Sequence, residues 1–210
     1  MTSSLNWQTP RLIAPATDDS DLPEPDPPPP AIRPDPRRHL TAWTTRDGVP
    51  VTIRPIRPED EPLMVRFHQA LSDATVHARY FGFLKLSERT AHQRLARVCS
   101  IDHDRVMALV AEHTDSATGE PEIVAVGRLI KAHCDEEAEF ALLVADGWQG
   151  RGLGSELLRL LIGIGRDEGL VRISGEILAT NAGMLRVSRR AGFTLRGDPA
   201  SGTIEAALSL

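Results

Sequence analysis

Apolar and polar positions recur with two different periods along residues 41–210, and this pattern predicts an α/β domain. Stretches in which apolar residues alternate with polar ones, or run together over a few positions, are typical of strands. The predicted strands are residues 41–46, 49–54, 106–113, 123–130, 137–144 and 171–178, with two shorter ones near 193–195 and 203–209. The dipeptide Asp47-Gly48 favours a hairpin turn between the first two strands.

Apolar residues spaced three and four apart predict helices over residues 58–71, 88–99, 152–168 and 180–190. Pro58 stands in the first turn of the first helix, Ser87 is a candidate N-cap of the second, and Gly169 is a candidate stop for the third. The order of the elements predicts a mixed central sheet of about seven strands, flanked by about four helices. In such a sheet a cofactor binds at the carboxyl end of a strand.

The first 40 residues differ in composition from the rest of the chain. They hold 10 of the 16 prolines, with scattered acidic residues among them. Such a segment buries too little apolar surface to offset the entropy of ordering it. We therefore expect residues 1–40 to be a disordered or polyproline-like tail and residues 41–210 to be the folded domain.

The net charge of -5 argues against a nucleic-acid partner and suits a basic one, such as a lysine side chain. The two cysteines, Cys99 and Cys134, are far apart and favour buried thiols in a reducing compartment. The triplet His133-Cys134-Asp135 lacks a second ligand cluster, so we expect no metal site. No apolar run approaches a membrane span, and the N-terminus lacks an apolar signal segment, so we expect a cytoplasmic protein.

Three alternating glycines mark the most informative part of the chain. Gly150, Gly152 and Gly154 lie between the strand that ends at Val144 and the helix that begins near Leu153. Glycine permits tight turns and close approach of a bulky anion, and the first amides of a helix have no partner within the helix. The pattern predicts a phosphate-binding loop; the alternative is a glycine-rich turn that caps an ordinary crossover helix.

The spacing of the loop excludes two common phosphate-binding patterns. A Walker loop requires a lysine before the serine, whereas Gly154-Ser155 has none. A dinucleotide fingerprint that starts at Gly150 requires a third glycine at residue 155, which is serine. The remaining pattern, Gln149-x-x-Gly152-x-Gly154, resembles the acetyl-CoA signature of the GNAT N-acetyltransferases.

The resemblance implies acetyl-CoA as acyl donor and assigns roles to the residues around the loop. Backbone amides would hold the pyrophosphate, and the set that it implies is Gln149, Gly150, Arg151, Gly152, Leu153, Gly154 and Ser155. The main chain of Leu142, Leu143 and Val144 would meet the pantetheine arm, in a gap where this strand and the next one splay apart. Asn181 would hydrogen-bond the arm, cap the following helix, or do both.

Acetyl transfer to a lysine needs a base, because an amine with a pKa of about 10.4 is protonated at neutral pH. Strand alternation places Glu137, Glu139, Ala141 and Leu143 on one face, and many GNAT enzymes carry their glutamate on this strand. We predict that Glu139 is the base. Glu137 would replace it if a bulge shifts the register, and Glu176 on the next strand is a further candidate.

The leaving thiolate of CoA also needs a proton. Many GNAT enzymes supply it from a tyrosine four residues before the Gly192-Phe193 pair, where this chain has Ser188. The only tyrosine is Tyr80. We expect CoA to leave with a proton from water or as the thiolate.

Six segments also resemble the acetyltransferase domain of bacterial Pat-type protein lysine acetyltransferases. They are residues 51–60, 77–81, 101–105, 136–140, 148–154 and 181–193. This resemblance implies a protein acceptor with an accessible lysine, such as an acyl-CoA synthetase (acetyl-CoA synthetase, for example), which acetylation would inactivate. The other interpretations are a small-molecule amine N-acetyltransferase and a non-catalytic acyl-CoA sensor. Tyr80 and Phe81 would line the acceptor side or pack in the core. Residues 102–105 would form either a polar network for the acceptor or a purely structural one.

Overall fold

The computed structural model describes residues 40–100, 105–132, 136–197, 200 and 202–210, so residues 1–39 of the predicted tail lie outside these ranges. The described residues form one mixed sheet of eight strands in the order β1-β2-β3-β4-β5-β6-β8-β7. Only β5 and β6 pair in parallel, and every other pair is antiparallel. The predicted α/β class is confirmed, and all eight predicted strands join the sheet, which was expected to hold about seven.

The strands lie close to the predicted ranges. Their bounds are β1 Thr41–Thr44, β2 Pro50–Pro55, β3 Val106–Thr114, β4 Pro121–Lys131, β5 Glu137–Val144, β6 Arg172–Leu178, β7 Thr194–Arg196 and β8 Thr203–Ser209. A hairpin turn joins β1 to β2, as predicted for Asp47-Gly48. Gly48 adopts a φ of 88°, a left-handed conformation that glycine takes without steric cost.

The described residues contain six α-helices, two more than expected. They are α1 Glu61–Gln69, α2 Asp73–Tyr80, α3 Leu86–Arg89, α4 His92–Cys99, α5 Leu153–Asp167 and α6 Ala182–Arg190, with 3₁₀ turns η2 at Pro58–Asp60 and η3 at Asp146–Trp148. The helix predicted over 88–99 is divided, because the chain leaves helical geometry between Thr90 and Ala91.

Helix α2 was not predicted because its sequence lacks an apolar stripe: Val76 is its only buried residue. Its beginning is instead specified by a polar contact. The hydroxyl oxygen of Ser72 accepts a hydrogen bond from the amide of Thr75 at 3.2 Å, which is a typical N-cap.

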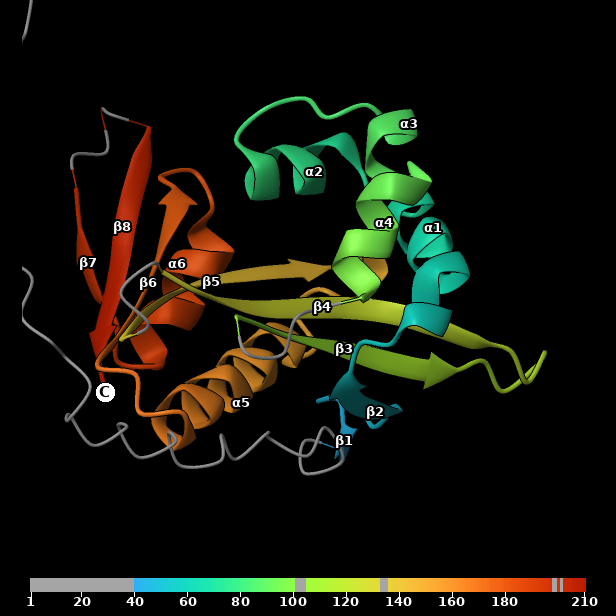
Figure 1. The fold of residues 1–210 in the computed structure, drawn as a ribbon. Coiled ribbons are helices and arrows are strands. Elements are labelled where there is room, and N and C mark those ends of the chain that lie inside the picture. The colour runs from blue at the N-terminus through green and yellow to red at the C-terminus, as the bar shows by residue number, and fades with distance from the viewer. Residues whose placement is uncertain (1–39, 101–104, 133–135, 198–199, 201) are drawn as a thin grey trace, which may run out of the picture. The chain divides into compact units, whose positions relative to one another are not determined.

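Helices cover both faces of the sheet (Figure 1). On one face, α5 packs Leu157, Leu158 and Leu161 against the central strands, and all three side chains are fully buried. On the other face, α1, α2 and α4 contribute Phe67, Val76 and Leu95 to a second core. The central strands are buried on both faces, so their apolar pattern is nearly continuous.

Strands β5 and β6 pair over only three positions, Glu137 with Arg172 to Glu139 with Ser174, and then diverge. Beyond this point β5 continues beside β4, and β6 continues beside β8. The ring of Phe140 packs at the divergence: a Cβ atom on Gly175 would lie 2.8 Å from it, so a larger residue does not fit there. The predicted splay beside the glycine loop is therefore confirmed.

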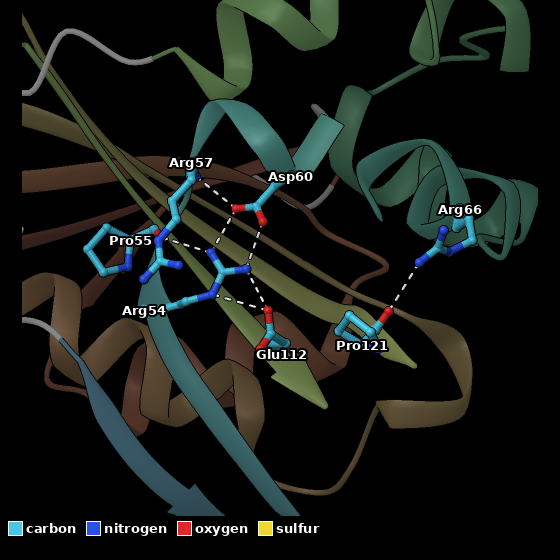
Figure 2. A network of polar contacts seen from close by, with 7 residues as sticks. All are labelled: Arg54, Pro55, Arg57, Asp60, Arg66, Glu112 and Pro121. Carbon is cyan, nitrogen blue, oxygen red and sulfur yellow. Dashed lines mark hydrogen bonds and ion pairs between the residues drawn. The ribbon is translucent and has the colours of Figure 1, made fainter. Parts of the chain in front are cut away.

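A buried ionic network joins β2 to η2 and β3 (Figure 2). The guanidinium of Arg54 donates two hydrogen bonds of 2.7 Å to Asp60, and it also donates to Glu112 at 2.6 Å. The carboxylate of Asp60 accepts a further bond from the amide of Arg57 at 2.8 Å. The network fixes the chain where it passes from the sheet into the helices of the second face.

Candidate active site

A cleft of about 1150 Å³ opens where β5 and β6 diverge. The cleft is lined by β5 from Glu139 onwards, by η3 and the glycine loop, by helix α2 and the residues just after it, by the end of β6, by helix α6, and by Arg46 of the β1–β2 hairpin. A cleft at the carboxyl ends of diverging parallel strands is the place where open α/β sheets bind cofactors. The structure thus brings Glu139, Glu176 and Asn181 to one cleft with residues 142–144 and most of the glycine loop.

The glycine loop presents a row of free amides to this cleft. Gly150 and Gly152 adopt φ values of 75° and 101°, and α5 begins directly afterwards at Leu153. Among the described residues, nothing accepts a hydrogen bond from the amides of residues 150–155. Unpaired amides at a helix N-terminus attract anions, so the loop fits a diphosphate group such as that of CoA.

The backbone amide of Gln149 was expected to face the pyrophosphate, but in the structure it already has a hydrogen-bond partner. Its amide donates to the carbonyl of Asp146 at 3.3 Å. Its side-chain Nε2 donates to the hydroxyl of Thr75 at 3.0 Å and to the carbonyl of Val144 at 3.2 Å. Gln149 therefore ties the loop to α2 and to the end of β5.

The side chain of Arg151 points away from the cleft. Its guanidinium forms an ion pair of 3.1 Å with Asp47 and stacks 4.8 Å above the ring of Trp148. The carbonyl of Arg151 also accepts a bond from the amide of Arg46 at 3.1 Å. These contacts hold the β1–β2 hairpin against the glycine loop.

Sequence reasoning missed four arginines that line the cleft: Arg46, Arg79, Arg186 and Arg190. Arg46 lies beside the glycine loop, since a Cβ atom on Gly152 would lie 3.4 Å from its Nε. Nothing local in the sequence marks Arg46, which is more than 100 residues from the loop. Together these cations suit a polyanionic ligand.

The candidate bases differ in their access to the cleft. Glu139 and Glu176 are exposed and line it, from the two strands that diverge. Glu137 does not line the cleft, and its carboxylate pairs with Arg172 at 3.3 Å. The register of β5 against β4 is regular from Ala138 to Val144, so no bulge exchanges Glu137 for Glu139.

The residues predicted to meet the pantetheine arm also border the cleft. Leu142, Leu143 and Val144 line it along β5, and Asn181 lines it at the start of α6. The Oδ1 atom of Asn181 accepts a bond from the amide of Met184 at 3.0 Å, so Asn181 caps α6. This cap leaves the side-chain NH₂ group of Asn181 as the donor for a ligand.

Ser188 lies outside the cleft. Its side chain is fully buried, and its hydroxyl has no hydrogen-bond partner among the described residues. It therefore offers no proton to a leaving group in the cleft.

Tyr80 is also absent from the cleft wall, whereas Phe81 lines it and is 41% exposed. Of the polar segment predicted at residues 102–105, residues 102–104 lie outside the described residues.

A polar clamp holds α2 against the glycine loop. The carboxylate of Asp146 accepts hydrogen bonds from the amide and hydroxyl of Ser72, at 2.9 and 2.6 Å, and from the hydroxyl of Thr75 at 2.8 Å. Burial alone would raise the pKa of Asp146, but these hydrogen bonds outweigh burial and hold the pKa below its ordinary value. The clamp thus positions α2 over one side of the cleft.

The described residues hold no group of three or more metal-ligating side chains, and the triplet 133–135 lies outside them. Cys99 is a free thiol, and burial raises its pKa to about 11, so it is a poor nucleophile. Across the described helices, none combines the length and apolar character that crossing a bilayer requires. The charged side chains that line the cleft include Glu139, Glu176 and the four arginines.

Comparisons with known proteins agree with this geometry. A family model described as an acetyltransferase (GNAT) domain matches residues 51–194. A Pseudomonas aeruginosa protein named as an acetyltransferase is 35% identical over 159 residues, which cover 75% of this chain and 82% of that protein.

Two further similarities involve proteins named Pat. Acetyltransferase Pat of Mycolicibacterium smegmatis is 29% identical over 163 residues, which cover 74% of this chain but only 46% of Pat. The crystal structure of the GNAT domain of S. lividans PAT superposes with a TM-score of 0.72 at 28% identity, covering 84% of this chain and 99% of that domain. The fold, the splayed strands and the matched residues lead to one conclusion: the chain belongs to the GNAT family and is an N-acetyltransferase that uses acetyl-CoA.

Proposed function

We propose that this enzyme acetylates the side-chain amine of lysine in a protein, and that an acyl-CoA synthetase such as acetyl-CoA synthetase is the acceptor. The observation that carries the proposal is the similarity to the GNAT domain of S. lividans PAT, because it extends over 99% of that domain. The proposal includes a cytoplasmic location, where acetyl-CoA and such an acceptor would meet.

The donor supplies its acetyl group as an activated thioester. In the proposed complex, the amides of residues 150–155 bind the pyrophosphate, and Arg46 adds positive charge beside it. The main chain of residues 142–144 and the side chain of Asn181 align the arm between the diverging strands. Fixed alignment lowers the barrier because the reacting groups no longer lose their freedom of motion in the transition state.

Glu139 acts as the general base in this proposal. It lies at the last paired position before β5 and β6 diverge, and its exposed side chain lines the cleft. A lysine ammonium must lose a proton before its nitrogen attacks, and the carboxylate of Glu139 accepts it directly or through water. Glu176, on the opposite wall, is the alternative base.

The thiolate of CoA leaves without a side-chain acid from α6, because Ser188 is buried away from the cleft. A free thiol has a pKa of about 8.5, so the thiolate is a fair leaving group and water supplies its proton. This role for water agrees with the openness of a cleft walled by exposed polar side chains.

Labelled acetyl-CoA, incubated with the enzyme and purified acetyl-CoA synthetase, tests the proposal. We expect label in the synthetase, located by peptide mass spectrometry on one lysine, and loss of synthetase activity in parallel. A panel of free amines and amino acids serves as the comparison. Transfer to free amines alone would overturn the protein-acceptor proposal, and binding of acetyl-CoA without any transfer would favour a sensor.

A further inference from the structure

A second, smaller cavity lies beside the cleft, between β4 and β5 on one side and helices α1, α2 and α4 on the other. Its volume is about 50 Å³. Four residues line both spaces: Arg79, Ala141, Leu142 and Leu143. The cavity therefore adjoins the part of the cleft along which β5 presents its main chain.

Three arginines line this cavity: Arg79 from α2, Arg94 from α4 and Arg128 from β4. The guanidinium groups of Arg79 and Arg94 lie 5.1 and 5.3 Å from the centre of the Tyr80 ring. No described carboxylate forms an ion pair with any of the three arginines. We call this group, with Tyr80 and His68, the arginine pocket.

Two buried nitrogen atoms of the arginine pocket lack a hydrogen-bond partner among the described residues, namely Nε of Arg128 and Nδ1 of His68. His68 is only 3% exposed. Burial, together with Arg89 and Arg94, lowers the pKa of His68 to about 4, so its ring is neutral at neutral pH. Burial, and then the charge of Arg79, lowers the pKa of Arg128. Nε of Arg128 is always a donor, and a buried donor without a partner is costly unless an acceptor reaches it.

An anion would satisfy all of these groups at once. It would accept a hydrogen bond from Nε of Arg128, and one from Nδ1 of His68 in the tautomer that carries the proton on Nδ1, and its charge would offset the mutual repulsion of the arginines. A space of about 10–15 Å³ accommodates one water-sized group, so 50 Å³ accommodates about four. A carboxylate with one adjoining methylene group has four heavy atoms.

We propose that the arginine pocket binds the carboxylate of a dicarboxylic acyl group, so that the enzyme takes an acyl-CoA with a terminal carboxylate, such as succinyl-CoA, in addition to acetyl-CoA. This proposal rests on the proposed function, because it takes from it the position of the thioester along β5, beside residues 141–143. An acyl chain that continues from there reaches the pocket, whose wall includes the same residues.

Isothermal titration calorimetry with non-hydrolysable dethia analogues of three acyl-CoAs tests the proposal without any acceptor protein. Succinyl and butyryl groups have similar length but differ in charge. We expect the succinyl analogue to bind at least tenfold more tightly than the butyryl analogue, as for a charge-assisted hydrogen bond in a buried site. Equal affinity of the two analogues for the wild-type enzyme would overturn the proposal, whatever any variant does.

Arg128→Met should abolish the succinyl preference and leave binding of the acetyl analogue unchanged. Arg97→Gln is the matched control: Arg97 lies on α4 near Arg94 but is exposed and lines neither space. A succinyl preference that survives Arg128→Met in a folded protein would overturn the assignment. Thermal unfolding of each variant shows whether the fold is kept.

Two further outcomes separate the possible failures. If free succinate or phosphate binds with the acetyl analogue already in place, and the succinyl analogue has no advantage, the pocket takes a free ion and the acyl assignment is wrong. If no acyl-CoA analogue binds at all, the proposed function fails together with this inference. Acetyl and butyryl analogues that bind as well as the succinyl one would overturn only the inference.

Discussion

Replacing Arg54 by methionine tests how much the buried network of Figure 2 contributes to the fold. The guanidinium of Arg54 makes both 2.7 Å bonds to Asp60, which is only 4% exposed. In Arg54→Met, the Asp60 carboxylate keeps a single described partner, the amide of Arg57. The loss of Arg54 destabilises the Glu112 carboxylate less, because a quarter of the Glu112 side chain is exposed to water.

The expected loss of stability follows from the uncompensated charge of Asp60. Removing one partner of a buried ion pair costs about 3–5 kcal/mol, mostly because the other charge remains buried. Native domains have free energies of unfolding of about 5–15 kcal/mol, so the variant should lose about a fifth or more of its stability. Methionine retains most of the apolar stem, so lost packing adds little.

Urea unfolding, followed by the fluorescence of Trp43 and Trp148, measures this loss. With an m-value of about 2 kcal/mol/M, the midpoint should fall by about 1.5–2.5 M while m is unchanged. Arg54→Lys should lie between the wild type and Arg54→Met, because lysine keeps the charge but not the two-pronged geometry.

Arg57→Met is the control, because Arg57 is exposed and joins the network only through its backbone amide. This variant should remain within about 0.5 kcal/mol of the wild type. A loss below about 1 kcal/mol for Arg54→Met would refute the reasoning, since water would then be compensating the Asp60 charge.

Further predictions concern the site and helix α5. Gly152→Ala should weaken acetyl-CoA binding in calorimetry. The φ of 101° at this position costs a residue with a side chain about 1–2 kcal/mol, and the new Cβ atom would lie 3.1 Å from the Trp43 ring. Unchanged affinity would contradict this. Gly163→Ala, in open space on α5, should raise stability to urea by up to about 1 kcal/mol. The pKa of Asp146 is lower in the folded protein than in the unfolded chain. The ionised carboxylate therefore stabilises the fold fully above the pKa of the unfolded state, and this stabilisation disappears as the pH falls through the pKa of the folded state. Wild type and Asp146→Asn should therefore differ in stability at pH 7 and converge in acid; a constant difference would show that charge plays no part.

The strand, loop and helix at the centre of the site could be predicted from the sequence because the signals there are local. Alternation of apolar residues defines β5, and the glycines and the apolar stripe that follows define the loop and α5. The alternation also placed Glu139 correctly on its strand. The divergence of β5 and β6 was predicted from the resemblance to GNAT enzymes, and their pairing over only three positions confirms it.

The parts that were not predicted depend on contacts between distant segments. Helix α2 has little apolar character, and its position depends on Asp146, more than 70 residues away. The backbone amide of Arg151 was expected to face the pyrophosphate, but nothing local in the sequence showed that its side chain would contact Asp47 and Trp148. The role of Arg46 beside the loop likewise depends on the fold, because only the hairpin carries it there.

A pH profile of Glu139→Gln, measured in single turnovers with saturating acetyl-CoA, tests the central claim most directly. If Glu139 is the base, the variant should be about 10²- to 10⁴-fold slower at pH 7 with little loss of CoA affinity. Its rate should rise with pH toward the pKa of lysine, about 10.4, as the amine deprotonates without help. Glu137→Gln, on the same strand but outside the cleft, is the control and should keep the wild-type profile. A Glu139→Gln enzyme with full turnover at pH 7 would contradict the account.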